Sequence, residues 1–210
     1  ENAELRNQIM LLQEARLENE NLRRELEFKS AVPNYHLLSA EVIGHDPNNL
    51  LQYLIIDRGA NDGLESGMPV LTADGLVGRI SRVNRSSATV MLISDASSSV
   101  SALIQQSRAT GLVQGHPSQE LVMRYIPQGE EVEVGDVVLT SGLGQNLPKR
   151  LVVGQVTSVK QSDVEMFLEA RVVPAVRLRD LEMVQVLLNF EAGVEDEQQE
   201  EAPAEEQAAS

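Results

Sequence analysis

Residues 67–80, with the sequence GMPVLTADGLVGRI, predict two short β-strands joined by a tight turn. The expected strands, 68–72 and 77–83, are rich in β-branched and other apolar residues, as strands of a packed sheet are. Between them, Asp74-Gly75 is a turn signal, because glycine accepts a positive φ without steric cost. The stretch therefore predicts one strand–turn–strand unit of an antiparallel β fold.

Short strands of the same kind continue through most of the chain. Residues 168–172 alternate apolar and charged side chains, as expected for a strand with one buried face. Only six residues are aromatic, so the core must be built from Val, Leu, Ile and Met. We expect a mainly β fold of closed or half-closed antiparallel barrels, since closure removes unpaired strand edges. The twelve candidate strands are 37–43, 50–56, 68–72, 77–83, 89–93, 99–104, 111–114, 121–125, 137–140, 152–159, 166–174 and 184–188.

A weak internal repeat suggests how these strands are divided. Residues 67–72 resemble 135–140, and residues 77–80 resemble 153–156. Two small six-stranded antiparallel β-barrels would explain the repeat, whereas a single larger sandwich is the competing interpretation. We place the first barrel at 37–105 and the second at 106–190. The sequence leaves open whether one barrel is inserted in the other.

The N-terminal residues 1–32 have the spacing of a coiled-coil helix. Glycine and proline are absent between Glu1 and Lys29, and an Asn at a seam position favours a two-stranded, in-register pair. We therefore predict a parallel homodimer, with a helix docked on its own globular domain as the alternative. The chain begins at Glu1 within this pattern, so we expect a further segment, such as a membrane anchor, before it. The predicted dimerisation seam is Leu5, Leu12, Ala15, Asn19, Leu22 and Leu26.

The charge of the chain is strongly acidic and unevenly placed. The net charge is −15, and residues 191–210 hold eight acidic residues with no Lys or Arg. A body without a basic stripe argues against a nucleic-acid partner. The tail is rich in Glu, Gln and Ala, so we expect residues 191–210 to be disordered and chiefly solubilising. The absence of cysteine excludes disulfides and thiolate sites.

Catalytic and metal sites are not indicated by the sequence. The three histidines, His36, His45 and His116, stand in expected turns, and no G-x-S-x-G motif is present. Asp57, Asn61 and Asp62 are close together but lack the ligand spacing of a calcium loop, and turn formation explains them better. We predict no catalytic residue, no metal and no cofactor.

The ordered motifs resemble the MreC family of bacterial rod shape-determining proteins over about residues 1–190. The motifs follow the coiled coil in the family's order, and each alone is weak whereas the ordered set is specific. They are Ala40-Glu41-Val42-Ile43-Gly44 with Asp46-Pro47, Ile56-Asp57 with Gly59 and Asp62-Gly63, Gly67-Met68-Pro69-Val70, Asp74-Gly75-Leu76-Val77-Gly78-Arg79-Ile80, Ser94-Asp95 with Ser97-Ser98-Ser99-Val100, and Gly135-Asp136 with Thr140-Ser141-Gly142-Leu143-Gly144.

The resemblance implies a non-enzymatic scaffold of the cell-wall elongation complex. Proteins of this family are held at the periplasmic face of the inner membrane by a single-pass anchor. They dimerise, can form filaments, and carry two barrels loosely like those of chymotrypsin but without its triad. Their implied partners are MreD, the actin-like MreB, RodA and a class B penicillin-binding transpeptidase. The implied action is to bind that transpeptidase and shift it toward an active conformation.

A partner surface is predicted in the Gly-rich loop that follows residue 140. Leu143 and Leu147 are the apolar candidates there, although such a loop can simply close a barrel. We expect Leu147→Asp to weaken partner binding without unfolding the barrel. Two alternative functions remain from sequence: a periplasmic membrane-fusion-type adaptor of an efflux or secretion system, and a degenerate serine hydrolase on a two-barrel fold.

Overall fold

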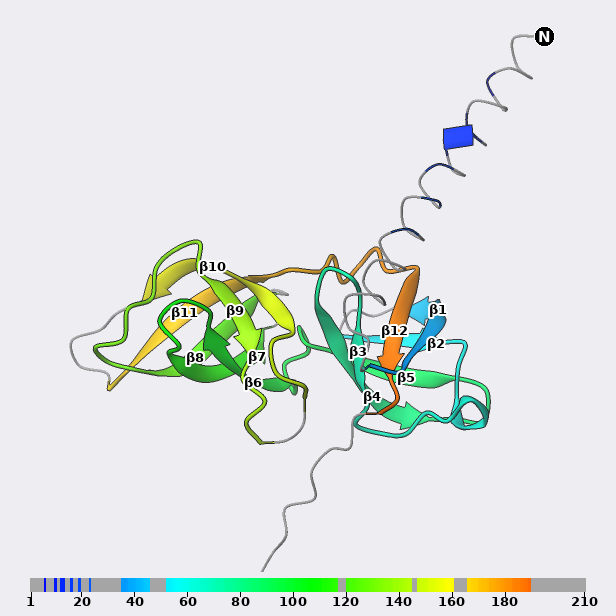
Figure 1. Cartoon of the computed structure of the whole chain (residues 1–210), viewed down its shortest axis with the longest axis horizontal. Helices are drawn as coiled ribbons and strands as arrows, with labels where there is room; N and C mark the ends of the chain where they lie inside the picture. Colours follow the sequence, from blue (N-terminus) through cyan, green and yellow to red (C-terminus); the bar gives the residue numbers. More distant parts are fainter. Residues whose placement is uncertain are drawn as a thin grey trace, which may run out of the picture.

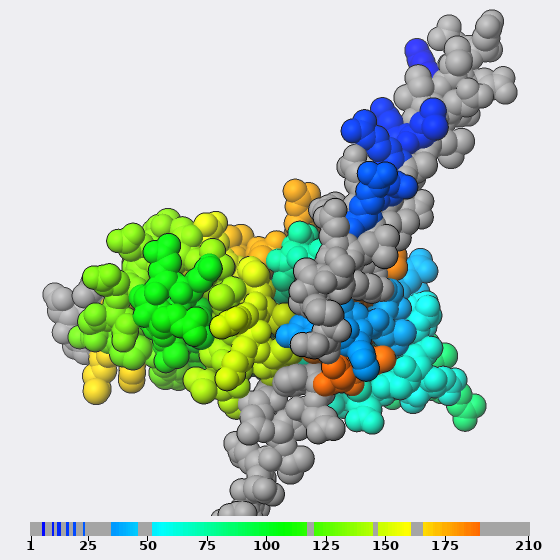
Figure 2. Space-filling view, in the orientation of Figure 1, coloured from blue at the N-terminus to red at the C-terminus, as the bar shows by residue number. Residues whose placement is uncertain are grey.

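The computed structural model describes residues 35–45, 52–116, 120–144, 147–160 and 166–189. It also describes seven separate N-terminal residues, all helical and exposed, which lie outside both barrels (Figure 2). In the described part of the chain, no helix has both the length and the apolar character needed to span a bilayer. The seven N-terminal residues are Arg6, Met10, Leu12, Gln13, Arg16, Asn19 and Arg23.

Two closed six-stranded antiparallel barrels lie side by side (Figure 1). This confirms the mainly β fold and the two barrels expected from the repeat. The first barrel has the strand order β1-β12-β3-β4-β5-β2. Its strands are β1 (Leu37–His45), β2 (Tyr53–Ile56), β3 (Pro69–Leu71), β4 (Leu76–Val83), β5 (Ala88–Leu92) and β12 (Met183–Leu187).

The second barrel is formed by the chain between β5 and β12. Its strand order is β10-β11-β8-β7-β6-β9. Within the described residues, every strand is hydrogen-bonded on both sides, so the barrels present no open sheet edge. The strands are β6 (Ser99–Ile104), β7 (Thr110–Gly115), β8 (Leu121–Pro127), β9 (Val137–Thr140), β10 (Val152–Lys160) and β11 (Phe167–Pro174).

The predicted division of the barrels at residues 105 and 106 is wrong. Strand β6 pairs with β7 and β9 of the second barrel, although 37–105 assigned it to the first. Strand β12 returns to the first barrel, where Leu187 pairs with Leu37 and Val186 pairs with Val70. The second barrel is therefore inserted, the possibility that the sequence left open. The predicted tail, 191–210, lies outside the described residues.

The internal repeat corresponds to equivalent strands of the two barrels. Gly67 N–H donates to Ile80 O at 2.8 Å, and Gly135 N–H donates to Val156 O at the same distance. The register then shifts just after Ile80 in β4 and just after Val156 in β10. The short sequence echo therefore marks a shared backbone geometry, and no single sandwich is needed to explain it.

Close packing between strands explains one glycine in each repeat. A Cβ on Gly78 would lie 2.0 Å from Met91 O, and one on Gly154 would lie 2.1 Å from Val173 O. Both partners are backbone atoms of the neighbouring strand, so a larger residue forces the sheet apart. The interior is aliphatic, as predicted, with Leu54, Ile56, Leu71, Leu76, Ile80, Ile104, Leu121, Met123, Ile126 and Leu187 among the largest fully buried side chains.

Candidate functional site: the outer face of the second barrel

The outer face of strands β8 and β11 carries three successive pairs of side chains. Arg171 Nη1 lies 3.1 Å from Glu120 Oε2, and Arg124 Nε lies 3.0 Å from Glu169 Oε1. The third pair is aromatic: the rings of Tyr125 and Phe167 meet edge to face, with centroids 5.8 Å apart. Alternation in β11 places these side chains outside, because Leu168, Ala170 and Val172 fill the core.

A β-bulge in β8 turns Tyr125 toward solvent beside Arg124. Leu168 pairs with Ile126 and Ala170 pairs with Met123, so Glu169 faces two residues of β8, Arg124 and Tyr125. Tyr125 has a φ of +60°, a left-handed conformation that non-glycine residues rarely adopt. Strained residues of this kind cluster at functional sites, because the rest of the fold must offset the strain; Arg108 and Arg150 share the conformation, but only Tyr125 places a large ring on the surface.

Exposure distinguishes this pair from Tyr35 and Tyr53, the other aromatic residues that the structure describes, which are half-buried. Tyr125 is 58% exposed and Phe167 is 42% exposed, and the neighbouring Met166 is also largely exposed. The chain has only six aromatic residues, and two of them meet on this surface. An apolar cluster rimmed by charges is typical of a protein–protein contact surface.

A shallow hollow of about 520 Å³ adjoins the aromatic pair. Side chains of β8, β10 and β11 line it, including Arg124, Glu169, Lys160 and Arg171. The residues of both ion pairs line this hollow and are half exposed, so each pair stabilises the fold by only about 0–1 kcal/mol. Their charges remain available to a partner, and we call Tyr125, Phe167, Met166 and the two ion pairs the β8–β11 face.

The partner surface predicted from sequence lies elsewhere on the same barrel. Leu143, in the loop after β9, is 61% exposed and is free to meet a partner. Leu147 is half-buried and packs against the hydrophobic core. The effect of Leu147→Asp stays a prediction; the contact of Leu147 with the core indicates that the charge would cost some stability, because it would face apolar neighbours. The structure does not bring Leu143 into the β8–β11 face.

Only part of the predicted dimerisation seam can be located. Leu12 and Asn19 are helical and exposed in the single chain. The other four seam residues, Leu5, Ala15, Leu22 and Leu26, lie outside the described residues. The two-stranded coil thus stays a prediction.

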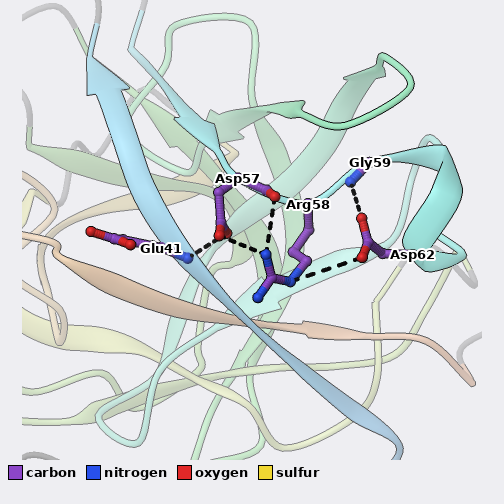
Figure 3. Close-up of polar contacts among 5 residues, drawn as sticks. All are labelled: Glu41, Asp57, Arg58, Gly59 and Asp62. Atoms are coloured by element: carbon purple, nitrogen blue, oxygen red, sulfur yellow. Dashed lines mark hydrogen bonds and ion pairs between the residues drawn. The ribbon is translucent and has the colours of Figure 1, made fainter.

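The acidic cluster of the first barrel is a turn that is closed by its own hydrogen bonds (Figure 3). Asp57 Oδ1 accepts from Glu41 N–H at 2.8 Å, and its Oδ2 lies 2.6 Å from Arg58 Nη1. Asp62 Oδ2 accepts from Gly59 N–H at 2.9 Å, at the start of the 3-10 helix Ala60–Asp62. Both carboxylates are occupied by protein donors, which favours turn formation over metal binding.

Histidines and acidic residues are not gathered into a reactive site in the part of the chain that is described. His36 precedes β1, His45 ends it, and His116 follows β7 in the other barrel; all three are exposed. Among described residues, no group of three or more His, Asp or Glu side chains could hold a metal ion.

A sequence model described as rod shape-determining protein MreC, barrel core, matches residues 42–188. A relative from Listeria monocytogenes, a cell shape-determining protein MreC, is 32% identical over 186 residues, which cover 86% of this chain and 63% of the relative. The MreC of Bacillus subtilis is 30% identical over 201 residues, with 90% and 69% covered. The chain thus spans less than two thirds of the Listeria relative.

Solved structures share the two-barrel fold. One, named MreC, superposes with a TM-score of 0.78 at 30% identity and covers 82% of this chain and 98% of its own. A second, described as the major periplasmic domain of the cell shape-determining filament MreC, has a TM-score of 0.64 at 25% identity, with 72% and 94% covered.

A third structure is a complex between a penicillin-binding protein (PBP2) and MreC from Helicobacter pylori. It has a TM-score of 0.61 and covers 73% of this chain and 98% of its own; at 19% identity it supports the fold alone. The sequence match extends through both barrels, and the overall architecture agrees with it. This chain therefore belongs to the MreC family of rod shape-determining proteins.

Proposed function

We propose that this chain is a non-enzymatic scaffold of cell-wall elongation that binds a penicillin-binding transpeptidase through the β8–β11 face. The observation that carries the proposal is the exposed pair of Tyr125 and Phe167 in a chain with few aromatic residues, with Tyr125 held outward by a bulge. The separate positions of the three histidines support a role without catalysis.

The physical basis of binding is the composition of this face. Aromatic side chains lose little conformational entropy on binding and bury a large area, so they dominate the free energy of many interfaces. The Arg124–Glu169 pair lies next to Tyr125 along β8, the Arg171–Glu120 pair lies further along the same two strands, and both would fix the orientation of a partner. A scaffold of this kind activates an enzyme only if it binds the active conformation more tightly than the inactive one.

A solved complex of another family member supports the proposed class of partner, a penicillin-binding protein. The H. pylori MreC has been solved with a penicillin-binding protein, and its fold resembles this one. We transfer the class of partner and not the contacts, because the identity is low. Leu143 is a second exposed apolar contact point for the same or another partner.

We further propose that the N-terminal helix pairs two copies through Leu5, Leu12, Ala15, Asn19, Leu22 and Leu26. The exposure of Leu12 supports this, since an apolar seam residue of a lone helix is left uncovered. Two linked copies would double the valency of the transpeptidase contact. The description of one related structure as a filament favours higher assembly as well.

The proposed location is the periplasmic face of the inner membrane. The description of a related structure as a periplasmic domain supports it. MreD, MreB and RodA remain expected partners through the family resemblance. Family membership disfavours the adaptor of an efflux or secretion system.

The proposal is tested by measuring the affinity of the chain for the periplasmic part of a class B penicillin-binding transpeptidase. Tyr125→Ala or Phe167→Ala should each weaken binding by about 2 kcal/mol, roughly thirtyfold in Kd. Val134→Ala, a truncation of an exposed apolar side chain before β9, is the matched control and should leave the Kd unchanged. Equal affinities for all four proteins would remove the β8–β11 face from the proposal.

A further inference from the structure

The two barrels are joined by two connections that are both packed against the fold. Residues 93–98 lead from β5 to β6, and residues 175–182 lead from β11 back to β12 (Figure 1). Ile93, Val176, Leu178 and Leu181 are buried, and they belong to one hydrophobic cluster that includes the cores of both barrels. The junction is thus part of the packed interior and is not an open linker.

One close contact between the barrels is made by Gly75. Gly75 lies in the turn between β3 and β4, and a Cβ built on it would lie 2.4 Å from Val152 O, at the start of β10. The same Cβ would lie 3.4 Å from the Cβ of Ala175, which directly follows β11. Val152 O is a backbone atom within a barrel strand, so it cannot yield as the end of a flexible side chain would.

A second close contact is made by Gly115, at the end of β7. A Cβ there would lie 2.1 Å from Asp95 O and 2.3 Å from the carbonyl carbon of Ser94, both in the first connection. That connection is fixed to the first barrel, because Asp95 Oδ2 accepts from Gln52 N–H at 2.9 Å and Ile93 N–H donates to Val77 O at 3.0 Å. Gly115 therefore brings the second barrel against a segment held by the first.

We propose that Gly75 and Gly115 are positioning residues that set one fixed angle between the barrels. The contacts hold the β8–β11 face in a single orientation relative to the first barrel, which carries the N-terminal helix. The importance of that orientation for cell shape rests on the function proposed above, whereas the fixed angle itself does not. A methyl group at either glycine requires the two barrels to move apart or rotate.

The angle can be measured as a distance between spin labels on the full chain. The sequence has no cysteine, so Ser86→Cys and Gln106→Cys, in exposed turns of the first and second barrels, give one specifically labelled pair. Double electron–electron resonance on the doubly labelled chain, with both glycines unchanged, should give a single narrow distance distribution. Adding Gly75→Ala or Gly115→Ala should shift or broaden the distribution.

The control is Gly67→Ala, at a glycine with a φ of +92° and no atom within 4 Å of the place that its methyl group would take. It introduces backbone strain without an inter-barrel clash and should leave the distance unchanged. A broad distribution in the unsubstituted pair would overturn the proposal even if the alanine variants failed to fold. Folded Gly75→Ala and Gly115→Ala variants with unchanged distances would overturn it too.

The functional consequence is measured separately from the function itself. The Gly75→Ala variant should keep its affinity for the transpeptidase, because the substitution does not touch the β8–β11 face. It should fail to restore rod shape to cells that lack the native copy. Restored shape despite a changed inter-barrel distance would contradict the positioning role. A Tyr125→Ala protein that still binds the transpeptidase would instead count against the proposed function and leave the fixed angle intact.

Discussion

Tyr125 and Phe167 meet edge to face across strands β8 and β11 with their ring planes at 75°, and both side chains remain exposed. The contact is worth about 0.5–1.5 kcal/mol, which is similar in size to the backbone strain of a non-glycine residue with positive φ. The folded chain therefore gains little net stability from placing an aromatic side chain in the bulge. A partner that covers both rings would provide the reason for it.

Tyr125→Gly separates binding from stability. Glycine accepts the φ of +60° without strain, so relief of strain should offset the loss of the contact with Phe167. We expect the free energy of unfolding to change by less than about 1 kcal/mol while transpeptidase binding weakens by roughly thirtyfold in Kd, as for Tyr125→Ala. Urea denaturation and binding measured on the same preparation test this prediction. A large loss of stability would assign Tyr125 to the fold instead.

The glycines of the two equivalent strands should be essential for folding. Gly78→Ala and Gly154→Ala place a methyl group about 2 Å from a carbonyl oxygen of the next strand, so each should destabilise by about 3 kcal/mol or more. Gly67→Ala and Gly135→Ala, where the methyl position is open, should cost about 1–2 kcal/mol from positive φ alone. Denaturant midpoints of the four variants give the comparison, and similar losses in all four would contradict it.

The junction carboxylate should make stability depend on acid pH. Burial alone would raise the pKa of Asp95, but the hydrogen bonds from the Ser97 hydroxyl, Gln52 N–H and Ser97 N–H together lower it. Because the folded-state pKa of Asp95 is depressed, the carboxylate contributes fully to the free energy of unfolding above about pH 4. This contribution is lost as the pH falls through the folded-state pKa.

Asp95→Asn should therefore lower the thermal midpoint at pH 7. Below about pH 4, the thermal midpoint of this variant should fall less steeply with pH than that of the unsubstituted protein. Replacing the carboxylate leaves at least one part-buried N–H without its present partner, at a cost of about 1 kcal/mol. Asp74→Asn, at an exposed turn position, is the control and should follow the unsubstituted protein. Identical pH profiles for all three proteins would exclude Asp95 as the titrating group.

The N-terminal helix should set the oligomeric state. Deletion of residues 1–32 should halve the mass in solution and leave the melting of the barrels unchanged, because each barrel closes on itself. Asn19→Leu should keep association but allow assemblies larger than dimers, since the buried Asn favours two strands. Sedimentation velocity measures both, and a dimer that persists after the deletion would rule out the helix as its cause.

The strands were predictable because their signals are local. Alternation such as Leu168-Glu169-Ala170-Arg171-Val172 and turns such as Asp74-Gly75 depend on neighbouring residues only. The barrel boundaries were not, because β12 reaches the first barrel by pairing Leu187 with Leu37 across the whole inserted barrel. Propensity indicates that a strand forms but not which distant strand it meets.

The candidate site was the part that sequence missed. The glycine-rich loop after β9 was predicted to meet a partner, but Leu147 in it packs against the core. Tyr125 and Phe167 lie in ordinary strand patterns, and the bulge that exposes Tyr125 contains no glycine that would indicate it in the sequence. The sequence did hold one indication of the site: aromatic residues are few in this chain, and these two stand near charged residues.

The most direct test of the proposed scaffold is photo-crosslinking in living cells, with the crosslinking amino acid at position 167 or at Arg85 on the first barrel. Both positions are exposed, so the crosslinking side chain can reach a neighbouring protein from either one. A crosslink to the penicillin-binding transpeptidase from position 167 and none from position 85 is the predicted result. No transpeptidase adduct from position 167, or equal yields from the two positions, would contradict the claim that the β8–β11 face binds this enzyme.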